Sequence, residues 1–148
     1  MEIAQTNNSN KDFLELTSQL DAELNERYGL KQTEYDMHNQ IVSIDTVIIG
    51  YLDGTPVACG CFKAFEEQTI EIKRMFVQKK HRRKGYSLKI LKSLERWASK
   101  LGNTKAILET GKGQPEALTL YAKCGYQTIE NYGPYKGLEN SVCMAKSI

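Results

Sequence analysis

TIEIKRMFVQKKHRRKGYSLKILKSLERWASKL, residues 69–101, is the stretch that decides the fold of this 148-residue chain. Residues 69–77 are rich in β-branched and aromatic side chains and predict a strand. A basic run, residues 78–84, then leads to Gly85 and to a segment with helical periodicity that Gly102 and Asn103 can end. One face of this predicted helix carries Leu88, Leu91, Leu94, Trp97, Ala98 and Leu101.

The order strand, basic loop, glycine and helix predicts an anion site. The first turn of a helix leaves backbone N–H groups without partners, and the helix dipole adds partial positive charge there. Gly85 would let phosphate oxygens approach the backbone, and arginine can bind a phosphate through two parallel hydrogen bonds. The run lacks the GKS or GKT of a P-loop and the GxGxxG of a Rossmann site. Positive charge around the loop would come from Lys79, Lys80, Arg82, Arg83 and Lys84.

Upstream of this stretch, apolar residues at intervals of three or four predict a helix over residues 11–28, ended by Gly29. Residues 31–40 have no clear period and are interpreted as a loop. Two β-rich runs, residues 45–52 and 55–65, are joined by Asp53 and Gly54, a pair suited to a tight hairpin turn. Downstream, the sequence predicts a strand over 106–110, a helix over 115–124, and strands over 126–129 and 141–146.

Length and composition favour one ordinary globular domain, residues 1–148. The net charge of +2 is too small to make nucleic acid or a membrane the default partner. Residues 1–11 lack the apolar core of a signal peptide, so we expect a cytoplasmic protein. The four cysteines form no metal-binding pattern, and we expect free thiols and no metal; Cys59 and Cys61 should pack on one face of a strand.

The segment RRKGYS, residues 82–87, resembles the acetyl-CoA signature (Q/R)xxGx(G/A) of the GNAT superfamily of N-acetyltransferases. Arg82, Gly85 and Ser87 fall on its fixed positions, although Ser87 replaces the usual glycine or alanine. The flanks, TIEIKRMFV and LETGKGQPEALTLYAKCGY, occur at the spacing the superfamily shows. The resemblance implies a mixed α/β fold with a central, mostly antiparallel sheet, splayed at the 69–77 strand, and helices on both faces.

The resemblance also implies where the co-substrate, acetyl-CoA, would bind. In the superfamily the strand before the signature offers backbone groups to the pantetheine arm, and the signature loop binds the pyrophosphate. Transferred to this chain, the strand contacts are Met75, Phe76 and Val77. The loop contacts are Arg82, Arg83, Lys84, Gly85, Tyr86 and Ser87.

Tyr121 lies in ALTLYAKCGY, which resembles the family's AxxLYxKxGF block, where the matching tyrosine is the usual general acid. A phenol with a pKa near ~10 can protonate the leaving thiolate without being ionised at neutral pH. The alternative is a core tyrosine on an amphipathic helix.

Glu71 is the first candidate for the general base, because an acidic residue between Ile70 and Ile72 needs a reason to be there. Strand alternation predicts Glu71 on the same face as Lys73, Met75 and Val77. The alternative for Glu71 is a cross-strand ion pair with a lysine or arginine.

Glu109 ranks second as the base and is otherwise a carboxylate for binding the acceptor amine. Glu34 and Tyr35 in the 31–40 loop, and Tyr132 in the segment NYGPY, lie where superfamily members build the amine pocket. The alternative for the loop residues is an exposed polar surface.

The sequence therefore predicts an N-acetyltransferase that transfers the acetyl group from acetyl-CoA to a primary amine, of a small molecule, by direct attack in a ternary complex. Three alternatives stay open: a sensor that binds acyl-CoA without turnover, a nucleic-acid-binding module built on the basic run, and an acyl enzyme formed on a cysteine. The resemblance leaves a homodimer open.

Overall fold

The computed structural model describes residues 1–29 and 43–148. Their strands are β1 (Glu2–Thr6), β2 (Val47–Leu52), β3 (Thr55–Glu66), β4 (Thr69–Val77), β5 (Lys105–Gly111), β6 (Gln127–Ile129) and β7 (Ser141–Ser147). Their helices are α1 (Lys11–Tyr28), α3 (Tyr86–Lys100) and α4 (Pro115–Lys123), with short 3-10 turns η2 (Lys79–His81) and η3 (Gly133–Tyr135).

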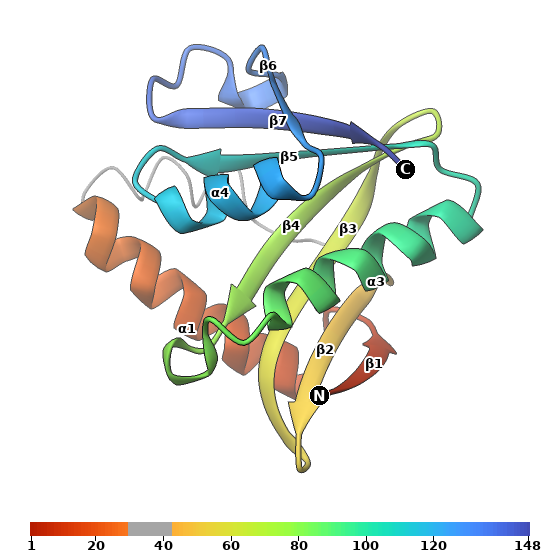
Figure 1. The fold of residues 1–148 in the computed structure, drawn as a ribbon, viewed down its shortest axis with the longest axis vertical. Helices are drawn as coiled ribbons and strands as arrows, with labels where there is room; N and C mark the ends of the chain where they lie inside the picture. The colour runs from red at the N-terminus through yellow and green to blue at the C-terminus, as the bar shows by residue number, and fades with distance from the viewer. Residues whose placement is uncertain (30–42) are drawn as a thin grey trace.

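The strands form one sheet in the order β1-β2-β3-β4-β5-β7-β6. All neighbours are antiparallel except β4 and β5, which pair in parallel only from Thr69 opposite Lys105 to Ile72 opposite Leu108. Beyond that point the two strands separate, and Figure 1 shows them opening into a V. The predicted mixed α/β fold, with a mostly antiparallel sheet splayed at β4, is confirmed.

Local sequence signals explain the ends of several elements. The Asn10 side chain accepts hydrogen bonds from the N–H groups of Asp12 and Phe13 and so caps α1, which ends before Gly29 as predicted. Asp53 and Gly54 both have positive φ, 49° and 80°, which suits the tight turn predicted between β2 and β3.

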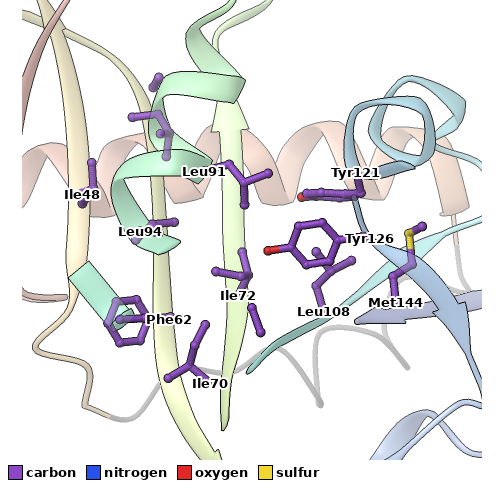
Figure 2. Close-up of a cluster of buried hydrophobic side chains, with 14 of the residues drawn as sticks. Ile48, Phe62, Ile70, Ile72, Leu91, Leu94, Leu108, Tyr121, Tyr126 and Met144 are labelled. Atoms are coloured by element: carbon purple, nitrogen blue, oxygen red, sulfur yellow. The ribbon is translucent and has the colours of Figure 1, made fainter. Parts of the chain in front are cut away.

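Two apolar clusters hold the helices on opposite faces of the sheet. α1 packs on one face through Phe13, Leu16 and Leu20, against a cluster that includes Cys59 and Cys61. α3 packs on the other face through Ile90, Leu91 and Leu94. Figure 2 shows this second cluster continuing to α4 and β7, where Tyr121 and Tyr126 lie beside Leu108 and Met144. Each face of the sheet is therefore covered around the splay.

Some sequence expectations need correction. No element was predicted for residues 1–10, yet Glu2–Thr6 forms an edge strand against β2. Leu101 was expected on the buried face of α3, yet it is 60% exposed, because it caps the helix just beyond its last turn. Ile90, which the periodicity did not single out, is buried in its place.

The alternation expected along β4 is also wrong, because the strand contains a β-bulge. Lys73 lies opposite Cys61 and Phe76 opposite Cys59, so Arg74 and Met75 together face the single residue between the two cysteines. Arg74 has a φ of 59°. The extra residue reverses the alternation, which a strict two-residue period cannot anticipate. Glu71 and Lys73 therefore lie on the opposite face from Met75 and Val77, which pack with the α3 cluster.

None of the helices in the described ranges is long and apolar enough to cross a membrane.

Candidate active site

A cavity of about 100 Å³ lies in the splay between β4 and β5. α1 contributes residues to one side of the cavity and α4 to the other. The cavity opens where β4 and β5 no longer pair. The residues that line it are Leu20, Leu24, Tyr28, Glu71, Ile72, Lys73, Arg74, Met75, Glu109, Thr110, Gly111, Gln114, Ala117, Tyr121 and Tyr135. Both candidate bases and the candidate acid from the sequence are thus brought to one cavity.

Glu109 follows Leu108, the last residue of β5 that pairs with β4. Its carboxylate accepts a hydrogen bond of 2.7 Å from the Ser141 hydroxyl on β7. Burial raises the pKa of Glu109 to about 7, partly offset by that hydrogen bond and by the positive charge of Lys73. A carboxyl group with this pKa can exchange a proton near neutral pH, as a general base must.

Glu71 is buried, and its carboxylate already has several partners. One oxygen accepts a 2.7 Å hydrogen bond from the Tyr132 hydroxyl. The other lies 3.8 Å from the ammonium of Lys63, its cross-strand partner on β3, and 3.8 Å from that of Lys73. These contacts favour the ion-pair interpretation of Glu71 over the role of base.

Lys73 and Tyr135 are cavity residues that the sequence interpretation did not single out. The Lys73 side chain is only 4% exposed, and its ammonium donates a 3.2 Å hydrogen bond to the Tyr135 hydroxyl. Burial lowers the pKa of Lys73, although Glu71 opposes the shift. The signal available in the sequence for Lys73 was a charged residue next to Ile72 inside a predicted strand. Tyr135 lies within the NYGPY segment, but the sequence alone does not rank it against Tyr132.

Tyr121 is buried on α4, lines the cavity, and packs edge-on against Tyr126 with ring centroids 5.8 Å apart. Burial raises the pKa of its phenol above the ordinary value. The hydroxyl therefore keeps its proton at neutral pH and can act as a proton donor. Figure 2 shows the ring at the edge of the apolar cluster, so Tyr121 is both a core residue and a cavity residue.

The loop between β4 and α3 has the form of an anion site. Gly85 caps α3 in the left-handed region with a φ of 82°, and Arg83 has a φ of 65°. Among the described residues, no backbone carbonyl accepts a hydrogen bond from the N–H groups of residues 83–88. A Cβ built on Gly85 would meet no atom within 4 Å, so the space beside its backbone is open. Consecutive N–H groups without a carbonyl partner at a helix start suit an anionic phosphate.

The signature residues differ in what their side chains do. Arg83 and Lys84 are exposed, whereas Tyr86 and Ser87 are half-buried. Phe76 packs with the α1 cluster. The Arg82 guanidinium is already bound by Glu23 of α1, at 2.7 Å from each carboxylate oxygen. Because Glu23 occupies both terminal nitrogens of Arg82, we expect a phosphate to contact the loop backbone and not this side chain.

The four acceptor-site residues expected from the sequence have different outcomes. Glu109 lines the cavity. Tyr132 does not line it, but its hydroxyl holds the Glu71 carboxylate there. Glu34 and Tyr35 lie outside the described residues.

Cys59 and Cys61 pack in the same apolar cluster, as the sequence predicted, and all four cysteines are free thiols. Burial raises the pKa of the Cys61 thiol to about 12 and that of Cys143 to about 11, which opposes a role as a nucleophile. Among residues 1–29 and 43–148, no group of three or more His, Cys, Asp or Glu could hold a metal ion.

Residues 11–126 match the acetyltransferase (GNAT) family. An IAA acetyltransferase of Azospirillum brasilense is 28% identical over 91% of this chain and 90% of its own length. A candidate acyl-CoA N-acyltransferase from Klebsiella pneumoniae is 29% identical in a structure that superposes with a TM-score of 0.83, covering 99% of this chain and 96% of the other. An aminoglycoside 6'-N-acetyltransferase complexed with coenzyme A has a TM-score of 0.72 at 15% identity, covering 99% and 97% of the two chains, and shares the fold.

Proposed function

The chain belongs to the acetyltransferase (GNAT) family, and from this membership we propose a specific assignment of its chemistry to the residues of the splay. The protein is an N-acetyltransferase that depends on acetyl-CoA. In the proposed assignment Glu109 is the general base, Tyr121 the general acid, and the loop at Gly85 the pyrophosphate site. The observation that carries it is that Glu109 and Tyr121 line one cavity where β4 and β5 separate.

The base must take a proton from the acceptor amine. The amine nitrogen attacks the thioester carbonyl carbon, so a C–N bond forms, the C–S bond breaks, and nitrogen has to lose a proton. With a pKa of about 7, Glu109 is partly ionised at neutral pH and can accept that proton directly or through a water molecule. Glu71, held by Tyr132 and the two lysines, instead supplies negative charge beside Glu109.

The acid must give a proton to the departing sulfur. Tyr121 has a raised pKa and an O–H that is protonated at neutral pH, so it can donate to a thiolate as the C–S bond breaks. After transfer Glu109 carries one extra proton and Tyr121 lacks one. Return of that proton through solvent restores both groups and leaves the thiol and the acetamide as products.

The loop would hold the co-substrate through its backbone. Its N–H groups from residues 83–88 suit the oxygens of a pyrophosphate, and Lys79, Lys80, Arg83 and Lys84 add positive charge nearby. Met75, which lines the cavity beyond the β4 bulge, lies where the pantetheine arm would pass in this assignment.

The acceptor in this proposal is the amine of a small molecule. The similarity to an IAA acetyltransferase along most of both chains supports this class. The cavity of about 100 Å³ has room for a small group beside Glu109.

Calorimetric titration with acetyl-CoA tests the proposed function, with dephospho-CoA as the comparison ligand. We expect micromolar binding of acetyl-CoA, followed by thiol release when small amines are supplied. Binding without thiol release over a broad amine panel would favour a sensor. Absence of binding, together with a salt-sensitive shift of duplex DNA, would favour the nucleic-acid interpretation of the basic run.

A further inference from the structure

Arg82 joins three parts of the molecule. Its two terminal nitrogens each donate a 2.7 Å hydrogen bond to a different oxygen of Glu23, which lies on α1. Its Nε donates a 2.8 Å hydrogen bond to the backbone carbonyl of Val77, the last residue of β4. The guanidinium also lies 5.6 Å from the centroid of the Phe76 ring. Arg82 thus begins the signature loop while bound to α1 and β4.

The contacts of Glu23 continue across the cavity. Arg27, one turn further along α1, lies 3.9 Å from Glu23 and 2.6 Å from Glu116 in the first turn of α4. Arg27 also donates a 3.1 Å hydrogen bond to the Gly113 carbonyl in the loop between β5 and α4. One edge of α1 therefore carries a chain of charges from the signature loop to the helix that bears Tyr121.

We propose that Glu23 is a positioning residue for the co-substrate: its carboxylate fixes Arg82, and through Arg82 it holds the signature loop in the conformation that presents its N–H groups to the pyrophosphate. The inference rests on the proposed pyrophosphate role of that loop. It assigns a function to α1, which lies outside the signature. In this inference Arg82 binds Glu23 and does not contact the phosphate directly.

Two physical arguments support this role. A bidentate arginine–carboxylate pair fixes both distance and orientation, so it can determine where the loop starts. The loop also needs such an anchor, because Arg83 adopts a φ of 65° that residues with a Cβ rarely adopt, immediately after Arg82. A loop already held in its bound shape loses less conformational freedom when the ligand binds, which strengthens binding without any new contact.

The test compares Glu23→Gln, Arg82→Gln and the double variant with the wild-type protein, using calorimetry with CoA and with pantetheine, which lacks the pyrophosphate. Each single variant should raise the Kd for CoA about tenfold, and the double variant should be no weaker than either single one. Pantetheine affinity, measured by competition, should stay at the wild-type value in all three. Glu26→Gln, an exposed neighbour on α1, should bind CoA like the wild type.

Glu23→Asp, which keeps the charge on a shorter side chain, is a second variant in case Glu23→Gln does not fold. Its Kd for CoA should fall between those of the wild type and Glu23→Gln, with an unchanged far-UV circular dichroism spectrum. Wild-type CoA affinity in both Glu23 variants, with weakened binding only in Arg82→Gln, would overturn the inference, because Arg82 would then contact phosphate directly. Failure of the wild-type protein to bind CoA would instead overturn the proposed function itself.

Discussion

The Ser141 hydroxyl on β7 donates a 2.7 Å hydrogen bond to the Glu109 carboxylate on β5, at the point where β5 has left β4. This contact opposes the burial that raises the pKa of Glu109 to about 7. Lys73 acts in the same direction as Ser141, whereas the negative charge of Glu71 acts with burial. Burial is the main cause of the raised pKa of the proposed base, and three neighbours that can be changed one at a time adjust it.

We predict that kcat increases with pH through about pH 7 and then levels off, because only ionised Glu109 can accept the amine proton. Ser141→Ala removes the hydrogen bond that favours the carboxylate, so the midpoint of this profile should move to higher pH. The measurement is kcat between pH 5.5 and 9 with an amine from the screen. A midpoint unaffected by Ser141→Ala would mean that another group titrates.

Glu71→Gln should have the opposite effect on the same profile. It removes a negative charge that raises the pKa of Glu109, so the midpoint should move to lower pH while most of the activity is retained. Glu109→Gln should abolish the pH dependence and lower kcat by about 10²-fold or more. If Glu71→Gln abolishes the pH dependence and loses about 10²-fold in kcat while Glu109→Gln keeps most of its activity, the ranking from the sequence, with Glu71 as the base, is correct.

Glu109 should also cost the protein stability as the pH rises from acidic to neutral. Its pKa is raised from 4.5 to about 7 by folding, so the folded state holds the proton more tightly and unfolding free energy falls as pH rises between these values. Glu109→Gln removes this fall. Urea unfolding should show the variant gaining about 2 to 3 kcal/mol relative to wild type between pH 5 and pH 8. Glu130→Gln, an exposed glutamate, should show no such change.

Tyr121→Phe should lower kcat by roughly 10²-fold while leaving acetyl-CoA affinity nearly unchanged. Phenylalanine keeps the edge-on packing against Tyr126, so the loss would come from the proton donor and not from the core. Turnover and calorimetric affinity, measured on the same preparation, separate the two effects. A variant with wild-type turnover would remove Tyr121 from the mechanism and leave it as a core residue.

Most of the fold was predictable because its signals are local. The prediction of strand, basic loop and helix around Gly85 needed only the periodicity of the side chains and a glycine that can adopt positive φ. The end of α1 at Gly29 was predicted from the same two local signals. The bulge at Arg74 was not predictable, since nothing in TIEIKRMFV distinguishes a residue with positive φ from its neighbours. Its consequence is large, because it decides on which face of the sheet each β4 side chain after Lys73 lies.

The site was predictable in its residue types and less so in their roles. The sequence indicated Glu71, Glu109 and Tyr121, and all three line the cavity. It ranked Glu71 above Glu109, whereas the proposed assignment reverses that order. The reversal depends on contacts from distant segments, which the sequence does not show: Tyr132 and Lys63 hold Glu71, and Ser141 holds Glu109. For the same reason the Glu23 contact of Arg82, across 59 residues of sequence, was not foreseen.

The last prediction concerns Gly85, whose φ of 82° and open surroundings make it the residue of the signature loop most sensitive to a side chain. Gly85→Ala should weaken acetyl-CoA binding by at least tenfold, because a Cβ would enter the space beside the N–H groups and strain the backbone. Gly54→Ala is the matched control, since Gly54 has a φ of 80° and equally open surroundings in the β2–β3 turn. Both variants should lose about 1 kcal/mol of unfolding free energy from backbone strain. Only Gly85→Ala should lose affinity; equal affinities in the two variants would mean that the pyrophosphate binds elsewhere.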